Sequence, residues 1–241
     1  MWFSGILKRN GLSKMILKQF FDTQSSTFTY VVASRKTQDA LIIDSVAENT
    51  NEYIDFLNQN KLNLLYALDT HIHADHISGI NSLQEQTSCK ALMGEKTDAK
   101  GLSKRLKHNE LISLGDLSVQ VLFTPGHTSD SYCFLVAGKL FTGDTLLIGE
   151  TGRTDFQNGN PASAYNSIFN ILLKLPENTE IYPGHDYNGN TMSTIGDEKK
   201  TNPRLQVKSE QEYIELMKNL DLPKPKKMDI AIPRNLKLGK E

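Results

Sequence analysis

The chain has 241 residues, of which 38% are hydrophobic and 23% are charged, and its formal net charge is −1. This length suits one large two-layer domain with a modest extension. The charge balance gives no concentrated basic footprint, so no nucleic-acid partner is expected, and no apolar run is long enough to span a bilayer. Cys89 and Cys133 form neither a metal-binding pair nor a disulfide framework, which favours two buried, inert thiols.

The N-terminal segment is basic, with no acidic residue before Asp22. Its positive charges are Lys8, Arg9, Lys14 and Lys18. This pattern resembles a transit peptide, but Arg and Ser are sparse, so a short solvated leader at residues 1–14 is the competing interpretation. We therefore expect a cytoplasmic protein, with the mitochondrial matrix as the alternative.

Hydrophobic patterning predicts strands in chain order at residues 27–34, 40–44, 64–68, 118–123, 131–136, 139–141 and 180–182. Helical spacing predicts helices at residues 49–59, 77–86, 161–175 and 206–219. In the helix at 161–175, Ala164, Ile168, Ile171 and Leu172 share one face. Strands that come as hairpins, with helices between some of them, predict an α+β fold in which two mixed sheets pack together under outer helices.

The C-terminal part of the chain changes in character after residue 198. We expect the main domain to span residues 15–198, and residues 199–241 to form a helix and an extended tail that pack on the same domain. The tail at 222–232 is rich in Pro and Lys and is predicted to pack back through Met228, Ile230 and Ile232.

Five of the six histidines lie in motifs that follow predicted strands. The densest motif is THIHADH, which places His71, His73, Asp75 and His76 within six positions. Burying so many polar groups is costly unless a metal or a network satisfies them, and imidazole and carboxylate are common ligands of first-row metals. The sequence therefore predicts a metal site, whereas His108 lies in a charged stretch and is expected at the surface.

Distant residues are expected to complete this site: His127, Asp144 and His185, each directly after a glycine. Gly126, Gly143 and Gly184 suit sharp turns and close backbone approach. Residues two apart project to the same side of an extended loop, so His71 and His73 could hold one ion together. Asp75 and His76 could serve a second ion or a hydrogen-bonding shell.

The order of these motifs resembles the metallo-β-lactamase superfamily, in particular its glyoxalase II branch. Most closely, the chain resembles the persulfide dioxygenases of sulfide catabolism, the ethylmalonic encephalopathy protein family. The motifs are THIHADHISG (70–79), FTGDTLLIGETGRTDFQ (141–157), IYPGHDYNG (181–189), TNPRL (201–205) and NLDLPKPKKMDIAIP (219–233). GRTDFQ, NPRL and LPKP distinguish the dioxygenases from the hydrolases. Glu150 and Thr151 stand where some members carry a cysteine pattern, which puts any cysteine-linked regulation in doubt.

The resemblance implies a metallo-β-lactamase αββα sandwich and one iron(II) ion per chain, held by His71, His127 and Asp144. Two imidazoles and one carboxylate with open positions are typical of non-haem iron oxygenases. The implied reaction converts glutathione persulfide and O2 to sulfite and glutathione, with Asp75 as a catalytic orienting group. His73, His76 and His185 then belong to the outer shell or to a second metal site.

Two other functions are compatible with these residues. A filled second site would give a two-metal hydroxyacylglutathione hydrolase, although that enzyme typically has a longer helical C-terminal region. A catalytically silent binding protein is the third interpretation, but the intact His71, His127 and Asp144 argue against it.

Glutathione carries two carboxylates, which guanidinium groups can hold bidentately. Arg153 is the first candidate, with an ion pair to Asp155 as the competing role. The others are Arg204, which could instead clamp the tail, and the hydroxyls of Tyr187 and Thr128. By resemblance, the chain could also form a homodimer.

Overall fold

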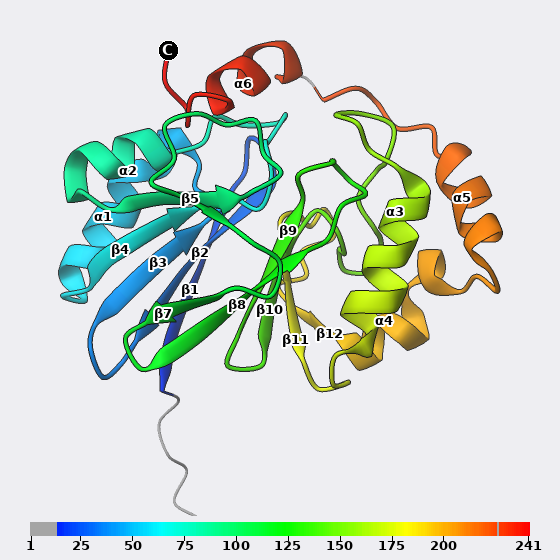
Figure 1. Cartoon of the computed structure of the whole chain (residues 1–241), viewed down its shortest axis with the longest axis horizontal. Helices are drawn as coiled ribbons and strands as arrows, with labels where there is room; N and C mark the ends of the chain where they lie inside the picture. The colour runs from blue at the N-terminus through cyan, green and yellow to red at the C-terminus, as the bar shows by residue number, and fades with distance from the viewer. Residues whose placement is uncertain (1–13, 226) are drawn as a thin grey trace, which may run out of the picture.

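Two six-stranded sheets pack face to face, and helices cover their outer surfaces (Figure 1). The computed structural model describes residues 14–225 and 227–241, so the expected leader lies outside the described residues except for Lys14. The first sheet runs in the order β1 (Met15–Asp22), β2 (Thr27–Ser34), β3 (Asp39–Ile43), β4 (Asn63–Leu68), β5 (Lys90–Gly94) and β6 (Lys104–Leu106). The second runs in the order β12 (Ser193–Thr194), β11 (Glu180–Pro183), β10 (Lys139–Gly143), β9 (Tyr132–Val136), β8 (Leu117–Phe123) and β7 (Leu111–Leu114).

Both sheets mix parallel and antiparallel pairs, which confirms the predicted α+β sandwich. In the first sheet β1, β2 and β3 are antiparallel neighbours, whereas β3, β4, β5 and β6 are parallel. In the second sheet β10 and β11 form a parallel pair beside antiparallel strands. Parallel strands need crossover connections, and these bring α1 (Thr50–Gln59) and α2 (Ile80–Thr87) onto the outer face of the first sheet.

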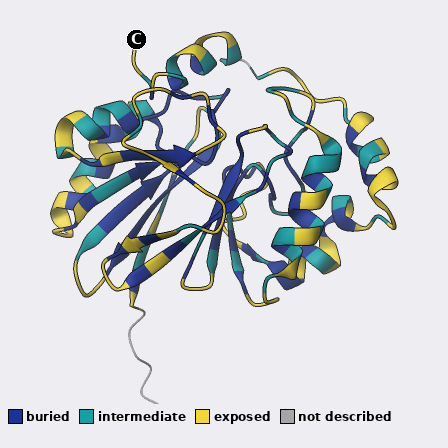
Figure 2. Ribbon diagram, viewed as in Figure 1, coloured by how far each residue is buried: buried dark blue, intermediate teal, exposed yellow. Residues whose placement is uncertain are grey.

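Strand β2 is buried on both faces, because the second sheet covers one face of its sheet and the helices α1 and α2 cover the other. Its side chains alternate: Tyr30 and Val32 pack between the two sheets, whereas Val31 and Ala33 pack beneath α1 and α2. This is the two-residue period of a strand. Figure 2 shows the resulting pattern, with buried strands in the centre and exposed faces on the outer helices.

The second sheet is covered by α3 (Pro161–Tyr165), α4 (Ile195–Thr201) and α5 (Glu210–Lys218) (Figure 1). The predicted helix at 161–175 begins at Pro161, but it is not one α-helix. It changes to a π-helical segment at Asn166–Ile171 and a 3₁₀ turn at Leu172–Lys174. Ala164, Ile168 and Leu172 still face the core, whereas Ile171 is half-buried.

The prediction of an extended tail at 222–232 is wrong for its second half, which forms α6 (Met228–Asn235). Residues before a proline are disfavoured in helical conformation, so Pro223 and Pro225 favour extended chain there. The helix begins after Lys227 and contains Pro233. Ile230 points outward and is 64% exposed, whereas Ala231 is fully buried. Ile232 and Leu236 pack against the cluster beneath α1 and α2, and Figure 1 shows α6 above α2.

The expected boundary after residue 198 falls inside α4, and the division into a main domain and a C-terminal part stays a prediction. Within the described part of the chain, no helix is long and apolar enough to cross a membrane.

Candidate metal centre

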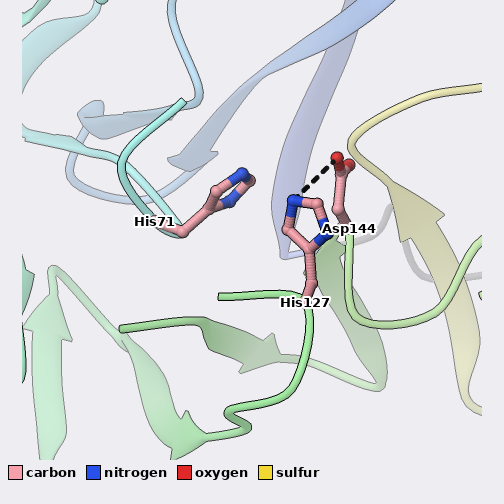
Figure 3. A group of neighbouring side chains, drawn as sticks. All are labelled: His71, His127 and Asp144. Carbon is pink, nitrogen blue, oxygen red and sulfur yellow. Dashed lines mark ion pairs between the residues drawn. The ribbon is translucent and has the colours of Figure 1, made fainter. Parts of the chain in front are cut away.

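His71, His127 and Asp144 come from three loops and converge at one edge of the sandwich (Figure 3). Each follows the end of a strand: β4, β8 and β10, respectively. One ligand atom from each lies within 4.8 Å of the others, and His127 Nε2 is 3.5 Å from Asp144 Oδ2. The structure therefore groups His71 with two residues that lie more than fifty positions away in the sequence.

Hydrogen bonds set the tautomers of the two histidines in this triad. The Thr70 hydroxyl donates to Asp44 Oδ2, so it accepts from His71 Nδ1 at 2.9 Å. His127 Nδ1 is 2.9 Å from the carbonyl oxygen of Arg153, which can only accept. Both protons thus lie on Nδ1, and each Nε2 keeps its lone pair. Ligating histidines are usually held in this way by an outer oxygen, so the donor set fits a divalent metal such as iron(II).

Asp75 lies at the centre of a network beside the triad. Its Oδ2 accepts from Thr27 Oγ1 at 2.9 Å and lies 2.9 Å from His76 Nδ1 and 3.1 Å from His185 Nε2. The other nitrogen of His185 is 2.7 Å from Asp144 Oδ1. This chain of contacts joins the expected outer residues to a metal-ligand candidate.

These contacts shift the pKa values of both carboxyl groups. Burial alone would raise the pKa of Asp144, but the positive charge of His185 and its contact at 2.7 Å hold it well below its usual range. The pKa of Asp75 is lowered as well, because its contacts with His76 and His185 outweigh the burial that would raise it. Both groups are therefore carboxylates at neutral pH, the form that a cation requires.

His73 is turned toward Asp44 rather than toward the triad. Its Nε2 is 3.1 Å from Asp44 Oδ1. Burial lowers the pKa of His73, but the Asp44 carboxylate reverses this and raises it to about 9. A second group of ligand atoms, from His73, Asp75 and His76, also lies within 4.8 Å. The residue types for a second ion are thus close together, although His73 already has an anionic partner.

The glycines before the ligands are needed for close approach, as the sequence predicts. A Cβ on Gly126, whose φ is +149°, would lie 2.3 Å from the Cα of Ala164. One on Gly143, at φ +47°, would lie 2.4 Å from Thr70 Oγ1, and one on Gly184 would lie 2.6 Å from Asp144 Oδ1. The turns that carry His127, Asp144 and His185 therefore pack where a side chain would not fit.

A cleft of about 410 Å³ opens onto the triad. Asp75, His185, Tyr187 and Phe156 contribute to its lining. Residues of the C-terminal segment form another part of the wall: Pro223, Lys224, Pro225, Lys227 and Met228. Its size and mixed polarity are typical of a site for a small molecule.

The structure brings Arg153 and Tyr187 to this cleft. Arg153 forms the bidentate ion pair with Asp155, at 2.7 and 2.8 Å, and donates to the carbonyl oxygen of Pro223 at 2.7 Å. Tyr187 is 68% exposed, and its ring stacks on His185 at a centroid distance of 6.0 Å.

Thr128 and Arg204 lie outside the lining of the cleft in the described chain. The Thr128 hydroxyl is buried and donates to Asp130 at 2.7 Å. Arg204 contacts Glu150 at 3.1 Å and donates to the carbonyl oxygen of Thr151. Arg204 thus ties the NPRL segment to residues 150 and 151, a structural role like the alternative named for it. His108 is exposed, which confirms the prediction of a surface residue.

The sequence pattern did not single out Asp44 as part of the site. Asp44 also accepts from the Thr70 backbone N–H at 2.7 Å and has a positive φ of 53°. A signal was available, because a buried predicted strand ends in this acid. Gln157, which also contacts the site, is the last residue of the motif GRTDFQ. Thr27 and Asn235 contact the site without a comparable local signal.

Comparison with known proteins agrees with this geometry. Residues 22–185 match the model of the metallo-beta-lactamase superfamily. The mouse protein named "Persulfide dioxygenase ETHE1, mitochondrial" is 38% identical over 93% of this chain and 89% of its own. The crystal structure of ETHE1 from Myxococcus xanthus is 42% identical, with a TM-score of 0.91 over 93% of this chain and 99% of that one. A hydroxyacylglutathione hydrolase of Dictyostelium discoideum is 33% identical over 66% of this chain and 62% of its own.

Proposed function

This chain belongs to the metallo-β-lactamase superfamily and, within it, to the persulfide dioxygenase family, and we propose that it oxidises glutathione persulfide with O2 at one iron(II) ion. The observation that carries this proposal is the triad of His71, His127 and Asp144, in which both imidazoles keep a lone pair on Nε2. When bound, iron(II) supplies open coordination positions and redox chemistry, which zinc lacks.

The proposed reaction takes one persulfide, one O2 and one water to one glutathione, one sulfite and two protons. The S–S bond breaks, the outer sulfur is oxidised and gains three oxygen atoms, and the inner sulfur leaves as the thiol. O2 accepts four electrons. Asp75 lines the cleft as a carboxylate beside Asp144 and His185. We assign it the role of orienting bound water and the neighbouring imidazoles.

Cationic groups beside the cleft support a substrate with two carboxylates. Arg153 lines it, and Lys224 and Lys227 line it from the C-terminal segment. Because Arg153 is already paired with Asp155, its contribution combines positive charge with support of the wall at Pro223. Tyr187 is the exposed hydroxyl donor at the same opening.

A two-metal thioester hydrolase is the second candidate, and one observation favours it. His73 Nδ1 and His76 Nε2 are buried without a hydrogen-bond partner among the described residues, and both residues lie beside Asp75. Against it, His73 Nε2 already contacts Asp44, and the hydrolase comparison covers a smaller part of the chain than the dioxygenase comparison.

Metal content and reaction products separate the two candidates. Protein purified without added metal is analysed for iron and zinc, then supplied with glutathione persulfide while O2 uptake and sulfite are measured. We expect one iron per chain and O2 uptake matched by sulfite. Two metals per chain with cleavage of S-lactoylglutathione, and no O2 uptake by iron-loaded protein, would overturn the proposal.

We further propose a cytoplasmic location and a homodimer. The word "mitochondrial" in the names of the mammalian relatives supports the alternative of the mitochondrial matrix. Fractionation of cells that express the full chain tests the location, and light scattering during gel filtration tests the dimer.

A further inference from the structure

We propose that Asn235, at the end of α6, is a positioning residue of the metal centre. It holds the backbone of residues 71–78, called the histidine loop below, which carries His71. The inference rests on the metal triad of the proposed function, and it assigns part of that site to the last seven residues of the chain.

The Asn235 side chain makes three hydrogen bonds to the histidine loop, all to backbone atoms. Its Oδ1 accepts from the N–H of Ser78 at 2.9 Å. Its Nδ2 donates to the carbonyl oxygens of His73 and His76, each at 2.9 Å. Asn235 is 2% exposed, so no water shell can replace these bonds at low cost. A carboxamide uses both of its donors and its acceptor here, a combination that neither Asp nor Leu offers.

The turn after α6 seats against the same loop. Gly239 has a φ of +88°, and a Cβ on it would lie 2.0 Å from the carbonyl oxygen of Ser78. The carbonyl oxygen of Leu238 accepts from the N–H of Asn81 at 3.1 Å, and the Leu238 side chain is buried in the cluster beneath α1 and α2. The end of the chain therefore meets the loop in one defined position.

Near Asn235, Val46 pairs with Ser78 in an isolated β-bridge, and the N–H of Ala47 donates to the carbonyl oxygen of Ile77 at 2.8 Å. The other side chains that bond to the loop backbone act at its opposite end. Ile72 N–H donates to Asp130 at 3.3 Å, and its carbonyl oxygen accepts from Gln157 Nε2 at 2.6 Å. Both supports come from loops of the second sheet. Asn235 alone provides the three side-chain hydrogen bonds to the loop backbone between His73 and Ser78. Metal ligands must stay within about 0.5 Å of their productive positions, so loosening this part is expected to weaken the metal site.

The test measures cobalt(II) affinity by chelator competition, together with the absorption spectrum of the cobalt(II) protein and its thermal unfolding. The variants are Asn235→Ala and Asn235→Asp, and the matched control is Leu238→Ala. Asn235→Asp keeps the acceptor for Ser78 and loses both donors. Leu238→Ala removes buried apolar contacts from the same turn and keeps the three bonds.

We expect both Asn235 variants to lower cobalt(II) affinity by roughly tenfold or more, as loss of outer-shell partners commonly does, and to change the spectrum. Leu238→Ala should lower the melting temperature while leaving affinity and spectrum as in the wild type. If Asn235→Ala does not fold, Asn235→Asp decides the outcome.

Wild-type-like cobalt(II) affinity in the folded Asn235 variant would overturn the inference while leaving the proposed function intact. An equal loss of affinity in Leu238→Ala would overturn it too, because general destabilisation would then explain the effect. If the wild type itself binds no cobalt(II) or iron(II), the proposed function fails, and the inference with it.

Discussion

The two halves of the sandwich hold their ligand candidates in different ways. In the first half, one loop carries His71, and side chains from distant segments hold the backbone of that loop. In the second half, His127, Asp144 and His185 come from separate turns, and glycines let those turns pack against neighbouring atoms. One centre thus combines a part held by side-chain hydrogen bonds with a part held by close backbone packing. The two parts should fail differently when they are mutated.

Asp144→Ala should have the largest effect, because Asp144 lies where the two halves meet. Its two oxygens face His127 and His185, and it is one of three proposed ligands. We expect metal affinity to fall by more than roughly a hundredfold, with turnover abolished. Iron content per chain measures this, with the exposed Asp55→Ala as the control. Full iron loading of the Asp144 variant would exclude it as a ligand.

Gly126→Ala tests the half held by backbone packing. The added Cβ would lie 2.3 Å from the backbone of Ala164, so the turn that carries His127 must move. We expect a loss of about 3 kcal/mol or more in the free energy of unfolding, together with weaker metal binding. Gly138→Ala is the matched control, because Gly138 also has a positive φ but nothing lies within 4 Å of its added Cβ.

The Gly138 control should cost only about 1–2 kcal/mol, the strain of a left-handed backbone. Urea unfolding of both proteins provides the comparison. Equal destabilisation by the two substitutions would show that packing around Gly126 is not what holds the turn.

Asp44→Asn tests the half held by side chains. The amide keeps the shape of Asp44, but it removes the charge beside His73 and the acceptor that orients Thr70 and, through it, His71. We expect metal affinity to fall by about 10- to 100-fold, with little change in secondary structure. Asp39→Asn, at the start of the strand β3 that Asp44 follows, is the control for chelator competition. An unchanged affinity would mean that Thr70 orients His71 unaided.

Arg153→Ala should affect the cleft more than the metal. It removes a positive charge and the bond that holds the wall at Pro223. Hydrogen bonds of charged groups contribute about 1.5–3 kcal/mol, so KM for glutathione persulfide should rise roughly tenfold or more. The change in kcat should be smaller, and metal content should stay as in the wild type. The exposed Arg35→Ala serves as control, and an unchanged KM would refute this role.

The smallest effect is expected at Glu110, which lies in the connection between β6 and β7 and outside the lining of the cleft. A hydrogen bond from Lys104, 2.5 Å away, lowers the pKa of Glu110 below its usual 4.5. Because the folded-state pKa is depressed, the stabilisation is present above pH 4.5 and is lost as pH falls through the folded-state value. Glu110→Gln should therefore cost under about 1 kcal/mol at neutral pH, and the cost should vanish in acid. A cost that persists in acid would point to lost packing instead.

Local patterning predicted several elements that pack on both sides, but it missed β5, whose Leu92 packs between the sheets while Ala91 and Met93 pack beneath α1 and α2. Strand β2 matches its predicted range because its alternation reflects two buried faces. The elements that were not predicted are the strands β1, β5, β6, β7 and β12 and the helices α4 and α6. Strand β1 is only partly buried. Helix α6 follows a Pro- and Lys-rich stretch whose composition is typical of extended chain, and its helical form depends on packing against the cluster beneath α1 and α2.

The sequence by itself determined the chemistry of the centre, because the ligand types and their glycines lie in short motifs at strand ends. Spacing alone could not decide which ligands share an ion, since within THIHADH it favoured His71 with His73, and only the family resemblance pointed to His71 with His127 and Asp144. Tertiary structure turned His73 to Asp44 and brought His127 and Asp144 to His71. It alone brought Asn235 to the histidine loop. The physical reason is that contacts between residues far apart in the sequence depend on how sheets and helices pack, which no local pattern records.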